Sequence, residues 1–222
     1  MTLLLFDIDG TLLLTGFAGV DAFEDSVKKM YNKSPGNVDF SGGLDSENAR
    51  AWISGTGEIP TEENLKIFKS HVEKRMPTSL EKCKGRVMPG VFSLLRKLDE
   101  MKISYGLLTG NWEKTGRMKL DFYNLNECFK WGAWADDAST REALVPIALE
   151  RAKKHGWEEN ENVWIVGDTH RDVETAHANN VKCLAVMTGC HSKKIKERLI
   201  NSKPDVLVKD LSDVEKIIQT II

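Results

Sequence analysis

The stretch Leu3-Leu4-Leu5-Phe6-Asp7-Ile8-Asp9-Gly10-Thr11 decides the fold of this chain. Its four successive apolar residues predict a strand that is buried on both faces, as in parallel sheets covered by helices. Ligands bind beyond the carboxyl ends of such strands, which puts Asp7 and Asp9 at a binding edge. Because side chains alternate along a strand, both acids face the same side while Ile8 turns toward the core. Gly10 permits a sharp exit from the strand.

The two acids at this strand end need a partner. Carboxylates this close repel each other unless they share a cation or a proton. Asp7 and Asp9 therefore indicate either a hard metal ion or one acid that stays protonated, and both arrangements suit phosphoryl chemistry. The motif alone also fits an apolar strand followed by an ordinary Asp-rich turn, so other parts of the site must support the interpretation.

Composition favours small-molecule chemistry. The chain has 222 residues, 41% of them hydrophobic, and its 31 basic and 33 acidic residues give a net charge of −2. We therefore expect neither a nucleic-acid nor a membrane partner. The N-terminal apolar run is short and acidic, unlike a signal peptide or a membrane span, so a cytoplasmic protein is expected. No role is assigned to the cysteines, which lack CxxC pairing: Cys83, Cys128, Cys183 and Cys190.

Helical patterns dominate residues 15–85. A first helix is predicted from apolar residues at helical spacing: Val20, Phe23, Val27 and Met30. A second runs toward Ile53, with Asp45 able to cap it. A third begins at Thr61, and Pro77 is predicted to end it. Loops are expected at residues 34–37 and 41–45.

This helical segment interrupts the alternation of strands and helices seen elsewhere in the chain. We therefore predict a Rossmann-like α/β core with a parallel sheet, formed by residues 1–14 and 86–222, and an inserted helical cap over residues 15–85. Glycines near both ends of the cap could act as hinges: Gly16, Gly19 and the segment from Gly85 to Gly90.

Further strands of the core follow from apolar runs at residues 103–108, 129–134, 163–166, 181–187 and 204–208. Two of them end in polar groups, as the first strand does. Residues 109–111 follow one of these strands, and residues 168–172 follow the other. If the three strands are neighbours in a parallel sheet, their ends meet at one crevice. The basic run at residues 193–198 is interpreted as a solvated helix face.

A magnesium ion would complete the chemistry of this crevice. A phosphate dianion and an attacking carboxylate repel each other, so phosphoryl transfer to Asp7 requires positive charge at the transferring oxygens. Mg²⁺ prefers hard oxygen ligands, and Asp7 and Asp168 with a backbone carbonyl near Asp9 would suffice.

Neutral donors for a phosphate are available on the neighbouring strand end. Thr109 offers a hydroxyl, and Gly110 and Asn111 offer backbone N–H groups at a helix start. Each of these sequence features also has an interpretation without a functional role. Thr109 to Asn111 can be a simple turn, Asp168 can cap a helix, and Arg141 can lie on the surface.

With these motifs in this order, the sequence resembles the phosphatases of the haloacid dehalogenase superfamily, and phosphoglycolate phosphatase-like proteins look nearest. The resemblance rests on residues 6–12, 107–111 and 167–172. The helical segment lies where that family inserts its cap, and residues 41–45 look like the substrate loop of the cap.

The resemblance implies a two-step hydrolysis. Asp7 would form an aspartyl-phosphate, and Asp9 would first protonate the leaving alcohol and then activate water. Mg²⁺ would be bound by Asp7, by the backbone carbonyl of Asp9 and by Asp168, with Asp172 as a further ligand or an acid just behind it. One departure is that the family usually has a lysine where this sequence has Arg141.

The position of Arg141 has two readings. In the first, Ser139 and Glu142 form a capping box that starts a helix at this point. In the second, the helix starts at Pro146, because proline is well tolerated at the first helical position, and Arg141 lies in the preceding loop. In either case its guanidinium could grip a phosphate or a carboxylate with two hydrogen bonds and replace the lysine. The alternative is a solvent-exposed arginine, with Lys153, Lys154 or another cation in this role.

The predicted activity is that of a Mg²⁺-dependent phosphatase acting on a small phosphorylated metabolite. A phosphomutase, which would return the phosphoryl group from Asp7 to a sugar, has the same motifs. A dehalogenase is disfavoured because it needs neither Asp9 nor a metal-binding Asp168. A non-catalytic phospho-acceptor module is disfavoured because an acceptor alone needs no general acid.

Overall fold

A six-stranded parallel sheet forms the centre of the molecule, which is described by a computed structural model over residues 2–36, 42–158 and 162–222. The strand order is β5-β4-β1-β6-β7-β8, and every neighbouring pair is parallel. The strands are β1 (Leu3–Phe6), β4 (Ser104–Leu108), β5 (Gly132–Ala133), β6 (Val163–Gly167), β7 (Lys182–Val186) and β8 (Val206–Val208). The predicted α/β class with a Rossmann-like parallel sheet is confirmed.

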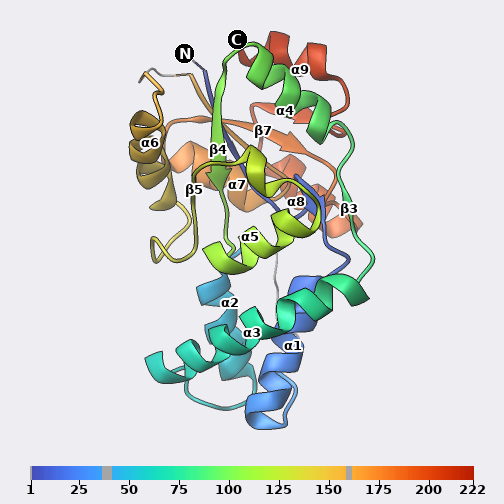
Figure 1. The fold of residues 1–222 in the computed structure, drawn as a ribbon, viewed down its shortest axis with the longest axis vertical. Coiled ribbons are helices and arrows are strands. Elements are labelled where there is room, and N and C mark those ends of the chain that lie inside the picture. The colour runs from blue at the N-terminus through green and yellow to red at the C-terminus, as the bar shows by residue number, and fades with distance from the viewer. Residues whose placement is uncertain (1, 37–41, 159–161) are drawn as a thin grey trace.

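Strand β1 lies in the middle of the sheet and is completely buried, as its four apolar residues predict. Leu3 and Leu5 pack into the core on one face, together with residues of α6 (Leu144–Lys154) and α7 (His170–Ala178). Leu4 and Phe6 pack on the other face with α4 (Val91–Glu100) and α9 (Val214–Ile221). Figure 1 shows helices on both sides of the sheet. The remaining helices of this part are α5 (Glu113–Phe122), η1 (Asn126–Cys128) and α8 (Lys193–Asn201).

The register of the three central strands places their carboxyl ends at the same level. Phe6 pairs with Leu107 of β4 on one side and with Val166 of β6 on the other. The polar residues that follow these strands therefore emerge next to one another at one edge of the sheet. This arrangement confirms that the strands ending in acids or threonine are neighbours.

Three helices form a separate layer that we call the helical insert: α1 (Ala18–Tyr31), α2 (Asp45–Gly55) and α3 (Glu62–Lys82). In Figure 1 they lie at the bottom of the view, beyond α5. Phe23 of α1 packs edge-on against Phe68 and stacks on Trp112 at the start of α5, with ring centroids 5.6 Å apart. This apolar contact joins the insert to the sheet-bearing part.

A short antiparallel ribbon of β2 (Leu13–Leu14) and β3 (Arg86–Val87) brings together the two chain segments that lead into and out of the insert. No sequence pattern predicts this ribbon, because two-residue strands are too short to show periodicity. The division into a core over residues 1–14 and 86–222 and a cap over residues 15–85 stays a prediction.

Several smaller expectations can be compared with the described residues. The basic run of residues 193–198 falls on α8 with its lysine side chains exposed. The cysteines are free thiols. Within the described ranges, no helix is long and apolar enough to cross a membrane. Asn37 and Ser41, which belong to the two loops expected in the insert, lie outside the described residues.

The prediction that Pro77 ends a helix is wrong, because α3 continues to Lys82. A proline inside a helix costs about 3 kcal/mol through its missing N–H and a steric clash. The buried side of α3 continues past the proline, however, with Ser79 and Leu80. Burial of the Leu80 side chain stabilises by about 1.5–3 kcal/mol, which offsets most or all of the cost of the proline.

Pro77→Ala is expected to stabilise the protein, since Pro77 is exposed and alanine restores a helical hydrogen bond without loss of packing. The free energy of unfolding, measured by urea denaturation, should rise by about 1–3 kcal/mol. Lys74→Ala, at an exposed position of the same helix, serves as the control and should change it by less than about 0.5 kcal/mol. A destabilised Pro77→Ala protein would mean that the proline shapes α3 to fit its neighbours.

Candidate active site

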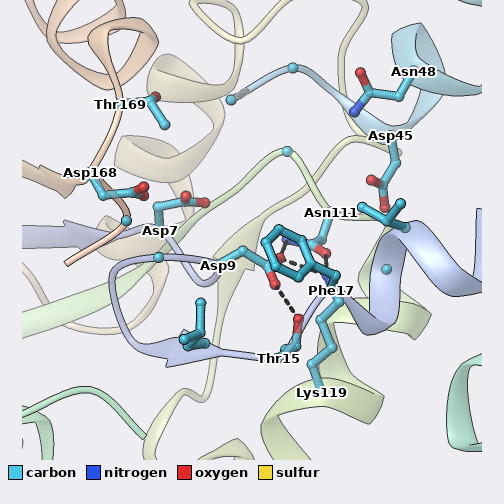
Figure 2. A pocket seen from close by; sticks show the side chains of 18 of the residues that line it. Asp7, Asp9, Thr15, Phe17, Asp45, Asn48, Asn111, Lys119, Asp168 and Thr169 are labelled. Carbon is cyan, nitrogen blue, oxygen red and sulfur yellow. Dashed lines mark hydrogen bonds and ion pairs between the residues drawn. The ribbon is translucent and has the colours of Figure 1, made fainter. Parts of the chain in front are cut away.

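Three buried carboxylates meet at the carboxyl edge of the sheet. Asp7 follows β1, Asp168 follows β6, and Asp172 lies in the first turn of α7. Oxygen atoms from all three lie within 4.8 Å of one another. Figure 2 shows Asp7 and Asp168 next to each other at the rim of a cavity. The structure therefore brings together three of the four acids that the sequence singled out.

Burial shifts the pKa values of Asp7 and Asp168. It raises the pKa of Asp7 to about 6, with the nearby Asp172 carboxylate adding to the effect and Arg141 opposing it. Burial also raises the pKa of Asp168 well above its usual range, and the charges of Asp172 and Asp7 raise it further. The carboxylates are thus held close at an electrostatic cost that a bound cation would remove.

Arg141 supplies part of the missing positive charge. Its Nη2 lies 2.5 Å from Oδ1 of Asp172 and 3.4 Å from Oδ1 of Asp7. Helix α6 begins only at Leu144, so Arg141 lies in the loop before it, and the reading with a helix start at Ser139 is wrong. The guanidinium is buried, which excludes the solvent-exposed alternative.

Asp172 has both carboxylate oxygens engaged. Oδ1 accepts from Arg141, while Oδ2 accepts from the backbone N–H of Thr169 at 2.9 Å and from its hydroxyl at 2.7 Å. These hydrogen bonds cap α7 and fix the carboxylate in place. Asp7 and Asp168 are consequently the more accessible of the three acids to a metal ion.

Asp9 belongs to a different group of side chains. Its Oδ2 accepts from Lys119 Nζ at 2.6 Å and from Asn111 Nδ2 at 2.9 Å, and its Oδ1 accepts from the Thr15 hydroxyl at 3.3 Å. Figure 2 shows this group below Asp7. Burial raises the pKa of Asp9, but Lys119, Asn111 and Thr15 outweigh it, and the net pKa lies below the usual value.

Lys119 was missed by the sequence analysis. It lies on α5, and its ammonium is also 2.6 Å from Oδ1 of Asn111. Burial lowers the pKa of Lys119, yet the charges of Asp9 and Asp45 outweigh that effect and raise it. The available signal was its spacing, because the buried side of α5 consists of Thr115, Gly116, Lys119 and Leu120. A lysine on the buried side of a helix needs a partner.

The loop from Thr109 to Asn111 connects the two groups of acids. A hydrogen bond from the buried Thr109 hydroxyl lowers the pKa of Asp7. Gly110 lies so close to the Gly43 carbonyl that a Cβ there would collide with it, which is why this position requires glycine. The Asn111 side chain is engaged with Asp9 rather than free for a ligand.

Asp45 does not cap its own helix as expected. Helix α2 begins at Asp45, and the residue before it is the N-cap. The Asp45 carboxylate instead accepts from the backbone N–H of Trp112 at 2.9 Å and so caps α5. Burial raises the pKa of Asp45 to about 6. The helical insert thus contributes a half-buried acid to the site. Arg141 Nη1 binds the insert in turn by donating to the Gly42 carbonyl at 3.2 Å.

A cavity of about 310 Å³ lies between the two parts of the molecule. From the sheet-bearing part it is lined by Asp7, Asp9, Asn111, Lys119, Arg141 and Asp168, among others. From the insert it is lined by Val20, Phe23, Asp45, Asn48 and Met76. A cavity of this volume, with apolar side chains and a few charged groups in its lining, is typical of a site for a small molecule.

Comparisons with known proteins show the family to which this chain is related. Residues 4–186 match the family of haloacid dehalogenase-like hydrolases. Phosphoglycolate phosphatase 1 of Pseudomonas aeruginosa is 26% identical over 96% of this chain and 78% of its own length. Pyrophosphatase PpaX of Oceanobacillus iheyensis is 25% identical over 97% of this chain and 95% of its own length. The crystal structure of a hydrolase from Pseudomonas syringae has a TM-score of 0.76 at 18% identity and covers 100% of this chain and 99% of its own.

The family match includes the buried acids at the sheet edge, the Thr109 loop and Arg141. It also extends over the helical insert and both chain segments that lead into it. Since it covers most of the sequence, this chain belongs to the haloacid dehalogenase-like hydrolases.

Proposed function

We propose that the protein is a Mg²⁺-dependent phosphatase that hydrolyses a small phosphomonoester through an aspartyl-phosphate on Asp7. The observation that carries this proposal is the cluster of three buried carboxylates with a single guanidinium, facing the cavity. Like charges are rarely buried together unless they bind a cation.

The residues present fit a magnesium ion. The acid cluster carries up to three negative charges, on Asp7, Asp168 and Asp172, whereas Arg141 contributes one positive charge. Carboxylate oxygens are also ligands that Mg²⁺ prefers. Because Asp172 is engaged with Arg141 and Thr169, Asp7 and Asp168 would hold the ion, together with the Asp9 backbone carbonyl. When bound, the ion would offset the negative charge of the phosphoryl oxygens.

In the first step, one oxygen of Asp7 attacks phosphorus and the bond to the leaving oxygen breaks. The leaving alkoxide needs a proton, which the Asp9–Lys119 pair supplies. The proton of this pair resides on Nζ, 2.6 Å from Oδ2 of Asp9, and passes through that oxygen to the leaving group. The Thr109 hydroxyl, which hydrogen-bonds Asp7, helps to hold the nucleophile in position.

In the second step, water attacks phosphorus and the acyl phosphate is cleaved. Asp9 accepts a proton from this water, and the pair returns to its initial state with the proton on Lys119. Inorganic phosphate and the free Asp7 carboxylate are the products. Side chains of the helical insert line the cavity, so the insert limits access of other water molecules to the intermediate.

The direct test combines Asp7→Asn with metal removal. Turnover of p-nitrophenyl phosphate should fall by at least about a thousandfold in Asp7→Asn, because an amide cannot replace the carboxylate nucleophile. Excess EDTA should abolish wild-type activity, and added Mg²⁺ should restore it. Asp121→Asn, at an exposed position of α5, is the matched control and should retain wild-type activity.

Activity within tenfold of wild type in Asp7→Asn, or full activity in EDTA, would contradict the proposal. Product analysis with a hexose phosphate separates hydrolysis from a phosphomutase reaction, since only hydrolysis releases inorganic phosphate.

Lys119→Met should lower kcat for alkyl phosphates by about a hundredfold, because it removes the proton held next to Asp9. The loss for p-nitrophenyl phosphate should be smaller, since that leaving group needs less protonation. Lys66→Met, at an exposed position of α3, controls for the loss of a lysine. Equal losses for both substrates would mean that Lys119 has no part in proton transfer.

Arg141→Ala should lower kcat/KM by about a hundredfold, because it removes a preorganised charge next to Asp7. Arg141→Lys should recover only part of the activity, since an ammonium cannot contact Asp7, Asp172 and Gly42 at once. Arg96→Ala, an exposed arginine on α4, is the control. Wild-type kinetics in Arg141→Ala would move this role to another cation.

A further inference from the structure

Phe17 has an unfavourable backbone and an exposed ring. It precedes α1 and adopts φ 68°, ψ 24°, in the left-handed region that bulky side chains rarely occupy. Its side chain is not buried in compensation, because the residue is 60% exposed. Backbone strain of this kind persists where the surroundings impose it and is concentrated at ligand sites. The position of the ring therefore calls for an explanation other than core packing.

The strained backbone directs the ring to the cavity. Phe17 is one of the residues that line it, and Figure 2 shows its ring among the side chains around Asp9. The ring meets His191 edge-on, with centroids 5.9 Å apart and planes at 88°. His191 also lines the cavity, and its Nδ1 is 2.8 Å from the Gly189 carbonyl, which fixes the imidazole. The two rings thus form one wall.

Apolar side chains continue this wall. Val20 and Phe23 of α1, Met76 of α3 and Ile195 of α8 line the same cavity. Two cationic side chains among the described lining residues are already paired with acids of the site, since Lys119 binds Asp9 and Arg141 binds Asp172. The organic part of a substrate would therefore meet mainly apolar groups, together with the half-buried acid Asp45.

We propose that Phe17 is a specificity-determining residue whose ring, together with His191, forms the wall of a compartment for the organic part of the substrate. The compartment selects phosphomonoesters with an apolar alcohol portion, aromatic or branched, over small anionic esters such as 2-phosphoglycolate. Edge-to-face contacts favour an aromatic group of the substrate beside Phe17. The carboxylate of 2-phosphoglycolate would instead lie near Asp45, with no unpaired lysine or arginine among the described lining residues to compensate its charge. This inference rests on the proposed phosphatase activity.

The test compares three alkyl phosphates in the presence of Mg²⁺. Ethyl phosphate and 2-phenylethyl phosphate both have primary alcohols as leaving groups, so the ratio of their kcat/KM values reports contacts to the phenyl group. We expect kcat/KM for 2-phenylethyl phosphate to exceed that for ethyl phosphate by about tenfold or more, mainly through KM. 2-Phosphoglycolate should be a poorer substrate than 2-phenylethyl phosphate.

Two substitutions separate the ring from the backbone. Phe17→Ala removes the ring and keeps the strained conformation, whereas Phe17→Gly removes both. Both should reduce the preference for 2-phenylethyl phosphate to about twofold or less, while only Phe17→Gly should raise the melting temperature, by about 2–4 °C. Phe92→Ala removes another exposed phenyl ring, 51% exposed on α4, and should leave the preference unchanged.

A wild-type ratio near one, or a ratio that survives in both Phe17 variants, would overturn the assignment of Phe17. A preference for 2-phosphoglycolate over both other esters would overturn the apolar class of substrate. The absence of turnover with all three esters and with p-nitrophenyl phosphate would instead overturn the proposed function, and this inference with it.

Discussion

The ion pair between Arg141 and Asp172, at 2.5 Å, is the interaction on which the site depends. Burying a carboxylate costs several kcal/mol unless a cation compensates it, and the sheet edge buries three. Arg141 contacts two of them and also donates to the Gly42 carbonyl of the loop before α2. One guanidinium therefore stabilises the acid cluster and connects it to the helical insert. The remaining negative charge of the three carboxylates makes this edge of the sheet suitable for a divalent cation.

Asp7 and Asp9 are separated by one residue, yet their surroundings shift their pKa values in opposite directions. Burial dominates at Asp7 and raises its pKa, whereas donors around Asp9, Lys119 first among them, lower it. Pairs of acids with diverging pKa values are typical of sites that assign them different tasks. The two side chains are chemically identical, so this difference between Asp7 and Asp9 comes from their neighbours.

The position of the insert over the cavity results from contacts of unequal weight. Lys114 and Glu73 form an ion pair at 2.6 Å, but exposed pairs of this kind contribute at most about 1 kcal/mol. The stacking of Phe23 on Trp112 buries two large aromatic side chains and contributes more. The apolar contact therefore contributes more than the exposed ion pair to holding the insert in place. The cavity walls depend on both.

The sequence by itself determined the buried first strand, the α/β class and the convergence of Asp7 and Asp168, because apolar runs and strand-end motifs are local and parallel strands end at a shared edge. Only the tertiary structure decided that Lys119 pairs with Asp9, that Arg141 bridges two acids, and that α3 continues through Pro77. A buried ion pair requires knowing which helix face meets which loop, and the cost of a proline is outweighed only by contacts made across the fold. Such contacts join residues far apart in the chain, and no local pattern encodes them.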